Sequence, residues 1–230
     1  MDIIESYGLI LIIVAAAVGF LMALGIGAND VANAMGTSVG SKALTIKQAI
    51  FIAAIFEFAG AYLAGGEVTS TIRKGIIDSG HFTNSPELLV FGMISALLAA
   101  GVWLAFASYL GWPVSTTHSI VGAIVGFAAV GVSVDAVAWG KVGSIIGSWI
   151  ITPAISGFIA YLIFQSAQKL IFDTDKPFEN AKRFVPGYMA MAGFVMALVT
   201  IKKGLKHIGL DIPDDEGYFI AAGIAVIVGV

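Results

Sequence analysis

Apolar residues come in long blocks along this chain, and short polar segments separate the blocks. The longest blocks cover residues 7–26, 45–64, 88–110, 134–164 and 185–201. A helix that spans the hydrocarbon of a bilayer needs about 20 residues, and most of these blocks approach or exceed that length. They also lack the amphipathic spacing of helices in soluble domains. The pattern therefore predicts an all-α, polytopic membrane protein.

Two shorter apolar runs differ from these blocks. Residues 114–130 follow a Gly-Trp-Pro sequence and are too few for a full span. The sequence ends with the apolar run 218–230, which is too short to cross the membrane, and a helix does not normally end partway through hydrocarbon. We therefore expect the 230 residues to be part of a longer protein.

Polar segments divide the chain into regions. A loop is expected at 65–86, with a short interfacial helix at 68–77 that includes Arg73 and Lys74 as interfacial anchors. The most polar connector covers 168–183, and it separates an apolar region at 1–167 from further transmembrane helices at 184–230. Pro153 lies inside the block at 134–164, where it predicts a kink or a helix that begins outside the membrane.

Composition supports the membrane assignment and excludes several functions. Hydrophobic residues make up 58% of the chain and charged residues 12%, whereas soluble domains carry about 25% charged residues. The net charge of −3 and the lack of a basic run give no reason to expect a nucleic-acid partner. The absence of cysteine excludes disulfides and thiolate sites within these residues.

A polar stripe follows the first apolar block. If residues 26–42 form a helix, four polar side chains recur at every fourth position and share one face. Asp30 lies beside the N-terminal end of this stripe. Such residues often serve only to join neighbouring membrane helices, but three carboxamide and carboxylate groups within five residues favour a binding site. The stripe consists of Asn29, Asn33, Thr37 and Ser41.

Two glycines, Gly25 and Gly27, weaken the helix just before the stripe and predict a broken helix over 20–41. The first turn after such a break would offer free N–H groups and the positive end of the helix dipole to an anion. Hard oxygen ligands beside the break would suit sodium. These ligands are the side chains of Asp30, Asn29 and Asn33.

A second candidate site begins the short run after Gly111. Pro113 suits the first turn of a helix, and the three hydroxyl residues that follow can cap the helix and contact a tetrahedral oxyanion. No lysine or arginine lies in this stretch, so dipoles, hydroxyls and bound cations would hold the anion. The alternative is an ordinary helix cap after a turn. The hydroxyl residues are Ser115, Thr116 and Thr117.

Glu57 lies within the apolar block at 45–64, in which Lys47 near the start is the other charged residue. An ionised carboxylate there needs a partner, a bound cation or a proton. A functional role is the default interpretation, and a structural ion pair is the alternative.

These residues resemble a known family. GANDVANAMGTSVGSKALTIKQA, then IFEFAGAYLAGGEVTSTIRKGI and GWPVSTTHSIVGAIVGFA, are similar to the inorganic phosphate transporter (PiT) family. The resemblance covers about residues 20–160 and suggests a bacterial or archaeal member. It implies symport of inorganic phosphate by alternating access, coupled to sodium or to protons. It also implies a homodimer of multi-pass chains in the plasma (inner) membrane bilayer.

The fold implied by the resemblance has two inverted repeats, each with a broken helix and a re-entrant helical hairpin. The first repeat would occupy 1–167, with its hairpin at 111–131. A second pair of motifs is absent from 119–230, so only the start of the second half would be present. The implied phosphate-binding residues are Ser115, Thr116, Thr117 and Asn33, and the implied sodium ligands are Asp30, Asn29, Asn33 and Glu57.

Two other functions fit parts of the sequence. A channel or uniporter would also use broken helices, but a central site with bound sodium favours alternating access. An intramembrane enzyme would need Ser115 or Thr116 as nucleophile and His118 as base. No aspartate or glutamate nearby could orient the imidazole, so we expect the protein not to be an enzyme.

Overall fold

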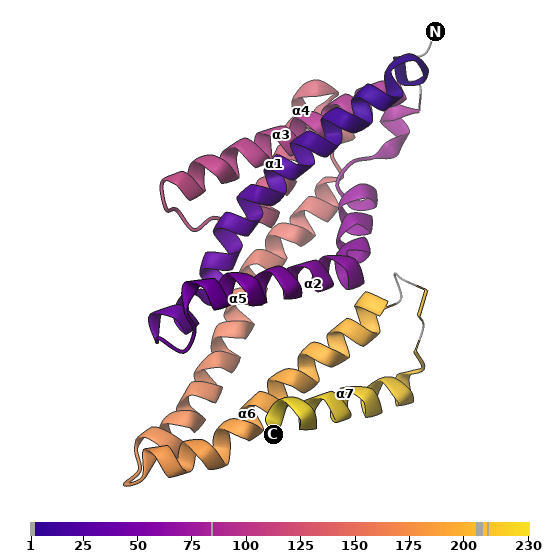
Figure 1. Ribbon diagram of the computed structural model, residues 1–230. Helices are drawn as coiled ribbons and strands as arrows, with labels where there is room; N and C mark the ends of the chain where they lie inside the picture. Colours follow the sequence, from indigo (N-terminus) through magenta and orange to yellow (C-terminus); the bar gives the residue numbers. More distant parts are fainter. Residues whose placement is uncertain (1–2, 84, 206–208, 211) are drawn as a thin grey trace. The chain divides into compact units, whose positions relative to one another are not determined.

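The computed structural model describes residues 3–83, 85–205, 209–210 and 212–230, without the side chains of 64, 66–74, 79 and 203. Arg73 and Lys74, predicted as interfacial anchors, thus lie outside the described side chains. Helices dominate the described residues (Figure 1). The helices are α1 (Ile3–Gly40), α2 (Ile46–Gly75), α3 (Pro86–Tyr109), α4 (Thr116–Gly131), α5 (Trp139–Ala167), α6 (Pro177–Val199) and α7 (Asp214–Gly229).

Among the described residues, 5 helices are long and apolar enough to cross a membrane. They involve α1, the first part of α2, α3, α5 and α6, whereas α4 is too short. The all-α membrane architecture predicted from the apolar blocks is therefore confirmed. The chain forms two compact units: Met1–Phe58 with Ser70–Val142, and Ala59–Thr69 with Gly143–Val230.

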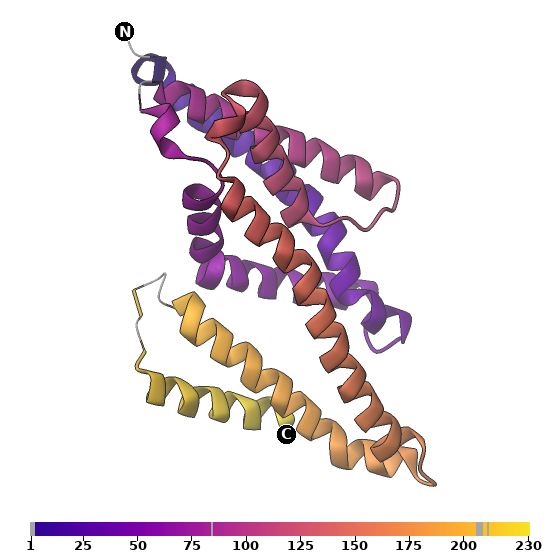
Figure 2. The same ribbon diagram turned by 180° about the vertical axis from the view of Figure 1, so that it is seen from behind.

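The first unit is built on a close crossing of α1 and α3, which lie side by side in both views (Figures 1 and 2). Met22 of α1 packs with Ala100 and Leu104 of α3 in a buried cluster. A Cβ atom added to Gly25 would lie 2.8 Å from the Cβ of Leu104. Gly25 is therefore required for close helix packing, because small residues let backbones approach within a membrane.

The predicted break in the first helix is wrong. Helix α1 runs without interruption for 38 residues, through Gly25, Gly27 and the polar stripe. Glycine weakens a helix by only about 1 kcal/mol, and packing of Gly25 against α3 offsets such a cost. Helix α2 likewise continues to Gly75, so the first part of the loop predicted at 65–86 is helical.

Helices α3 and α4 form an antiparallel hairpin. The ring of Phe127 on α4 packs directly over Gly92 of α3, and its centroid lies 6.1 Å from that of Phe82. At the other end the chain turns through Gly111, whose φ of +71° favours glycine. The segment predicted as the hairpin, 111–131, supplies only the turn and the second arm, since α3 is the first arm.

An isolated β-bridge between Ile77 and Val137 joins the segments that enter and leave this hairpin. The Asp78 N–H donates to the Ala136 carbonyl at 3.0 Å. The chain therefore enters and leaves the hairpin at the same end, opposite the turn at Gly111. Helix α4, with 16 residues, is about 24 Å long and shorter than the roughly 30 Å hydrocarbon layer. The arrangement is that of a re-entrant hairpin.

The second unit contains the packing of α6 against α7, which run antiparallel (Figure 2). Ala197 and Ile201 pack with Ala221 of α7 in a buried cluster. The hydroxyls of Ser166 on α5 and Tyr188 on α6 lie 2.6 Å apart and connect these two helices. Polar side chains of this kind join helices within an apolar environment.

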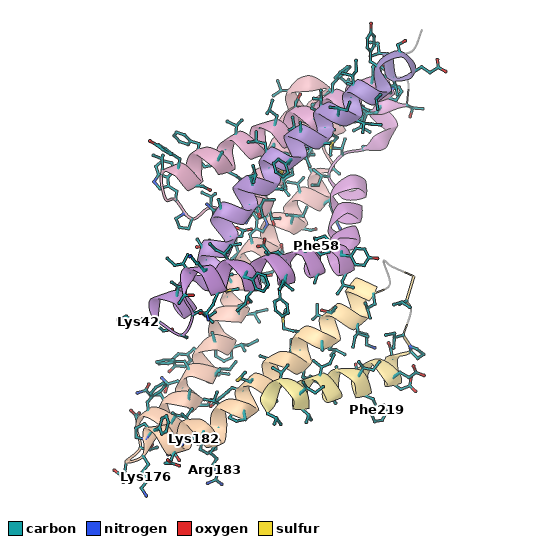
Figure 3. All side chains as sticks on the ribbon, in the orientation of Figure 1. Lys42, Phe58, Lys176, Lys182, Arg183 and Phe219 are labelled. Carbon is teal, nitrogen blue, oxygen red and sulfur yellow. The ribbon has the colours of Figure 1, made fainter. Side chains whose placement is uncertain are left out.

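Basic side chains gather where α5 connects to α6, as the labels of Lys176, Lys182 and Arg183 indicate (Figure 3). Helix α6 begins at Pro177, within the polar connector at 168–183. The ammonium of Lys182 lies 4.3 Å from the centroid of the Phe178 ring. Pairs of basic and aromatic side chains at the ends of apolar helices are typical of the membrane interface.

The contact of Phe127 with Gly92 gives a test of the hairpin. Gly92→Val should lower the free energy of unfolding by about 1–3 kcal/mol, because the new side chain overlaps the aromatic ring. Gly126→Val on α4 is the matched control, since apart from its chain neighbours and the backbone of its own helix no described heavy atom lies within 4 Å of its added Cβ. Thermal unfolding of the purified protein in detergent measures both. Equal stability of the two variants would contradict the packing.

Candidate functional site

The tip of the hairpin contacts α1 through Asn29, which is 6% exposed. The Asn29 side-chain amide donates to the Trp112 carbonyl at 2.9 Å. The Val114 N–H donates to Asn29 Oδ1 at 3.3 Å, and Ser108 Oγ lies 3.5 Å from Asn29 Nδ2. Both ends of one buried carboxamide thus bind the turn between α3 and α4.

The next residue of α1, Asp30, contacts the start of α4. Thr116 Oγ1 donates to Asp30 Oδ2 at 3.3 Å, although the two residues are 86 positions apart in the chain. Both side chains are half-buried. The two motifs that the sequence singled out therefore meet at this contact.

Helix α4 begins with a side-chain cap at Ser115, whose Oγ accepts from the His118 N–H at 3.2 Å. The backbone N–H groups of Ser115, Thr116 and Thr117 have no acceptor among the described residues. They lie at the positive end of the helix dipole. Helix starts of this kind bind phosphate and other oxyanions.

Two predicted site residues are not joined to this cluster. Asn33 lies one turn further along α1 and is exposed, and Glu57 is exposed on α2. No hydrogen bond or ion pair connects either side chain to another described residue. Thr117 is also exposed, so the contacts of the cluster involve Asn29, Asp30 and Thr116.

The depth of the cluster follows from the length of α1. Asn29 lies 11 positions before the last residue of this helix, Gly40. Eleven residues of helix measure about 16 Å, which is close to half of the roughly 30 Å hydrocarbon layer. If the C-terminal end of α1 reaches one surface of that layer, the cluster lies near its midplane.

The continuous α1 changes which groups could hold an anion. No half-helix begins at Gly27, so the backbone N–H groups that follow it are not free to bind an anion, contrary to the prediction. The start of α4 remains as the source of free N–H groups. No sequence pattern indicates the Trp112 carbonyl or the Val114 N–H as site groups, because every residue carries a backbone and only side chains differ.

Comparison with known proteins assigns the family. A model described as the phosphate transporter family matches residues 26–227. The chain belongs to the phosphate transporter family. This family consists of transporters, so the chain is not an enzyme, and the alternative of a hydrolase built on Ser115 and His118 is excluded.

Relatives support this membership. The chain is 55% identical over 227 residues to a Haemophilus influenzae protein described as a candidate phosphate permease, covering 99% of this chain and 54% of that protein. It is 48% identical over 168 residues to an Arabidopsis thaliana protein named inorganic phosphate transporter 2-1, chloroplastic, covering 73% of this chain and 29% of that protein.

A solved structure has the same fold. It is described as a sodium-dependent phosphate transporter, and the TM-score is 0.86 at 37% sequence identity. The match covers 95% of this chain and 53% of the other. The chain thus spans about half the length of the solved transporter and of the Haemophilus relative. The resemblance to the PiT family seen in the motifs is confirmed.

The cap on α4 can be tested separately from transport. Ser115→Ala should lower the free energy of unfolding by about 1 kcal/mol, whereas Ser115→Gly should lower it by only a few tenths. The difference arises because alanine removes the acceptor of the His118 N–H without the preference of glycine for cap positions. Unfolding of the purified protein is measured without phosphate. Identical losses for the two variants would contradict the cap.

Proposed function

We propose that this chain forms part of a carrier that moves inorganic phosphate together with sodium by alternating access. The contact between Asp30 and Thr116 is the main support. It places a carboxylate, which suits a cation, beside a helix start, which suits an oxyanion. The similarity to a structure described as a sodium-dependent phosphate transporter supports the same choice of ions.

The proposed phosphate site is the start of α4. Free N–H groups of Ser115, Thr116 and Thr117 would bind phosphate oxygens, and their hydroxyls would donate further hydrogen bonds. Asn33, one turn beyond Asn29 on α1, would contribute its side-chain amide. A site without lysine or arginine would hold phosphate weakly enough to release it.

The proposed sodium site is centred on the carboxylate of Asp30. The predicted oxygen ligands besides Asp30 are those of Asn29, Asn33 and Glu57, although Asn33 and Glu57 are exposed in this chain. Carboxylate and carboxamide oxygens are hard ligands, and sodium sites of carriers also use backbone carbonyls. Glu57 would join the site only after a rearrangement or would bind a separate cation.

Coupling between the two ions follows from charge. Without a cation, the Asp30 carboxylate accepts a hydrogen bond from Thr116 at the position where phosphate would bind. Phosphate is an anion, so Asp30 repels it in this low-dielectric region. Sodium bound to Asp30 removes that repulsion and frees the Thr116 hydroxyl for phosphate. We therefore propose that sodium binds before phosphate.

The location and assembly proposed for the carrier rest on the resemblance to the PiT family. The carrier would be a homodimer of multi-pass chains in the plasma (inner) membrane. Its transport cycle would expose the cluster near the membrane midplane to each side in turn. Within this proposal, the structure and the family support the multi-pass membrane location, through several helices long and apolar enough to cross a membrane.

Uptake into proteoliposomes tests the function. The reconstituted protein should accumulate radiolabelled phosphate when sodium is higher outside, since a tenfold gradient supplies about 1.4 kcal/mol per ion moved. A sodium ionophore should abolish the accumulation. Uptake that responds only to an imposed proton gradient would indicate that protons, and not sodium, are the coupling ion. Passive equilibration under both gradients would contradict coupled transport.

Asp30→Asn should remove most of the sodium dependence of uptake while changing the free energy of unfolding little. The variant keeps an acceptor for Thr116 and loses the charge that attracts the cation. Asp135→Asn is the control, because Asp135 is exposed and outside the cluster. Initial uptake rates are measured over a series of sodium concentrations. Normal sodium activation of Asp30→Asn would exclude Asp30 as the ligand.

A further inference from the structure

The Asn29 side chain is bonded to the protein through both its nitrogen and its oxygen, although its oxygen, with two lone pairs, accepts from one donor only. Its amide donates to the Trp112 carbonyl, and its oxygen accepts from the Val114 N–H. Among the described residues, Asn29 is also the only polar or charged residue that is buried. A buried carboxamide with both ends bonded to backbone resists replacement of either partner, because a lost partner leaves an unsatisfied group.

The Val114 side chain packs against the buried cluster of Met22, Ala100 and Leu104, but the turn that Asn29 holds has few other hydrogen bonds on its α4 side. Trp112 and Gly111 donate their N–H groups back to carbonyls at the end of α3. Pro113 has no N–H group to donate. The Val114 N–H, the last one before the helix cap, has Asn29 as its acceptor. The start of α4 is therefore fixed to α1 at this point.

The register of the next contact depends on this attachment. Asn29 and Asp30 are consecutive on α1, and their partners Val114 and Thr116 are two positions apart at the start of α4. A shift of the turn along α1 would break the bonds of Asn29 and move Thr116 away from Asp30. The position of the hydroxyl relative to the carboxylate is thus set by the neighbouring carboxamide.

We propose that Asn29 is a positioning residue, which holds the start of α4 against Asp30, and not a sodium ligand. This inference rests on the proposed function and revises the role that the motif suggested for Asn29. It has a consequence for movement: the middle of α1 and the tip of the hairpin move as one body during transport. The rearrangement that alternates access then occurs at other contacts.

A first experiment measures the attachment without transport. Pro113 is exposed at the tip, and the 230 residues contain no cysteine, so Pro113→Cys introduces a single thiol there. Adding Asn29→Ala should raise the rate of thiol labelling by a maleimide several-fold, because the tip is released from α1. Adding Thr37→Val, an exposed position two turns further along α1, should leave the rate unchanged. An unchanged rate with Asn29→Ala would overturn the proposal.

A second experiment separates positioning from ligation by ion selectivity. Asn29→Ala should raise the KM for phosphate at saturating sodium by about tenfold, because both hydrogen bonds to the turn are lost and the start of α4 can move away from Asp30. The ratio of uptake with sodium to uptake with lithium should stay at the parent value, because the atoms that contact the cation are unchanged. Asn33→Ala, which removes a proposed ligand, should change that ratio.

The isosteric variant Asn29→Asp completes the test. It keeps an acceptor for the Val114 N–H, loses the donor to the Trp112 carbonyl, and adds a further cation-binding carboxylate. Positioning predicts weaker phosphate binding and faster labelling at Pro113→Cys. Ligation predicts normal labelling with stronger sodium activation, and that result would overturn the proposal. If the parent protein shows no sodium-driven uptake, the proposed function fails, whereas the labelling rates still decide the role of Asn29.

Discussion

The two hydrogen bonds between the Asn29 side chain and the hairpin turn determine how the other parts of the candidate site meet. Hydrocarbon offers no alternative partner to a carboxamide or to a turn of backbone. The Trp112 carbonyl and the Val114 N–H therefore gain most by bonding to Asn29. Once the turn is fixed there, the first hydroxyl of α4 lies beside the next carboxylate of α1. The start of α4 and the Asp30 carboxylate form one cluster because the neutral Asn29 side chain joins the hairpin to α1.

The packing of the hairpin arms makes this attachment possible. Gly25 lets α1 approach Leu104 closely, and Gly92 gives space to the Phe127 ring between α3 and α4. Without a hydrophobic driving force between helices in lipid, such close contacts supply much of the association. The bridge between Ile77 and Val137 closes the open end of the hairpin. The hairpin is thus held by α1 at its tip and by a short backbone pairing at its open end.

Local signals predicted much of this fold. The apolar block at 88–110 became α3 (Pro86–Tyr109), and the run after Pro113 became α4 (Thr116–Gly131), because span length and Gly-Pro punctuation are properties of neighbouring residues. The break at Gly25 was predicted wrongly, since the reason for that glycine is Leu104 on another helix. The motifs also singled out Asp30 and Thr116 as candidate site residues. Their contact, like the bonds of Asn29 to backbone groups more than 80 positions away, depends on how the hairpin folds back.

A continuous α1 also changes the physical basis of coupling. In a broken helix, one element would supply both the cation ligands and the free N–H groups, so the two ions would share a rigid frame. Here the carboxylate belongs to α1 and the free N–H groups belong to α4. Their separation is therefore adjustable in principle, and the buried carboxamide beside them removes that freedom. Under the proposed function, a fixed separation is what ties phosphate affinity to sodium occupancy. If the two groups drifted apart, the carboxylate would no longer repel phosphate, and phosphate could bind and leave without its cation.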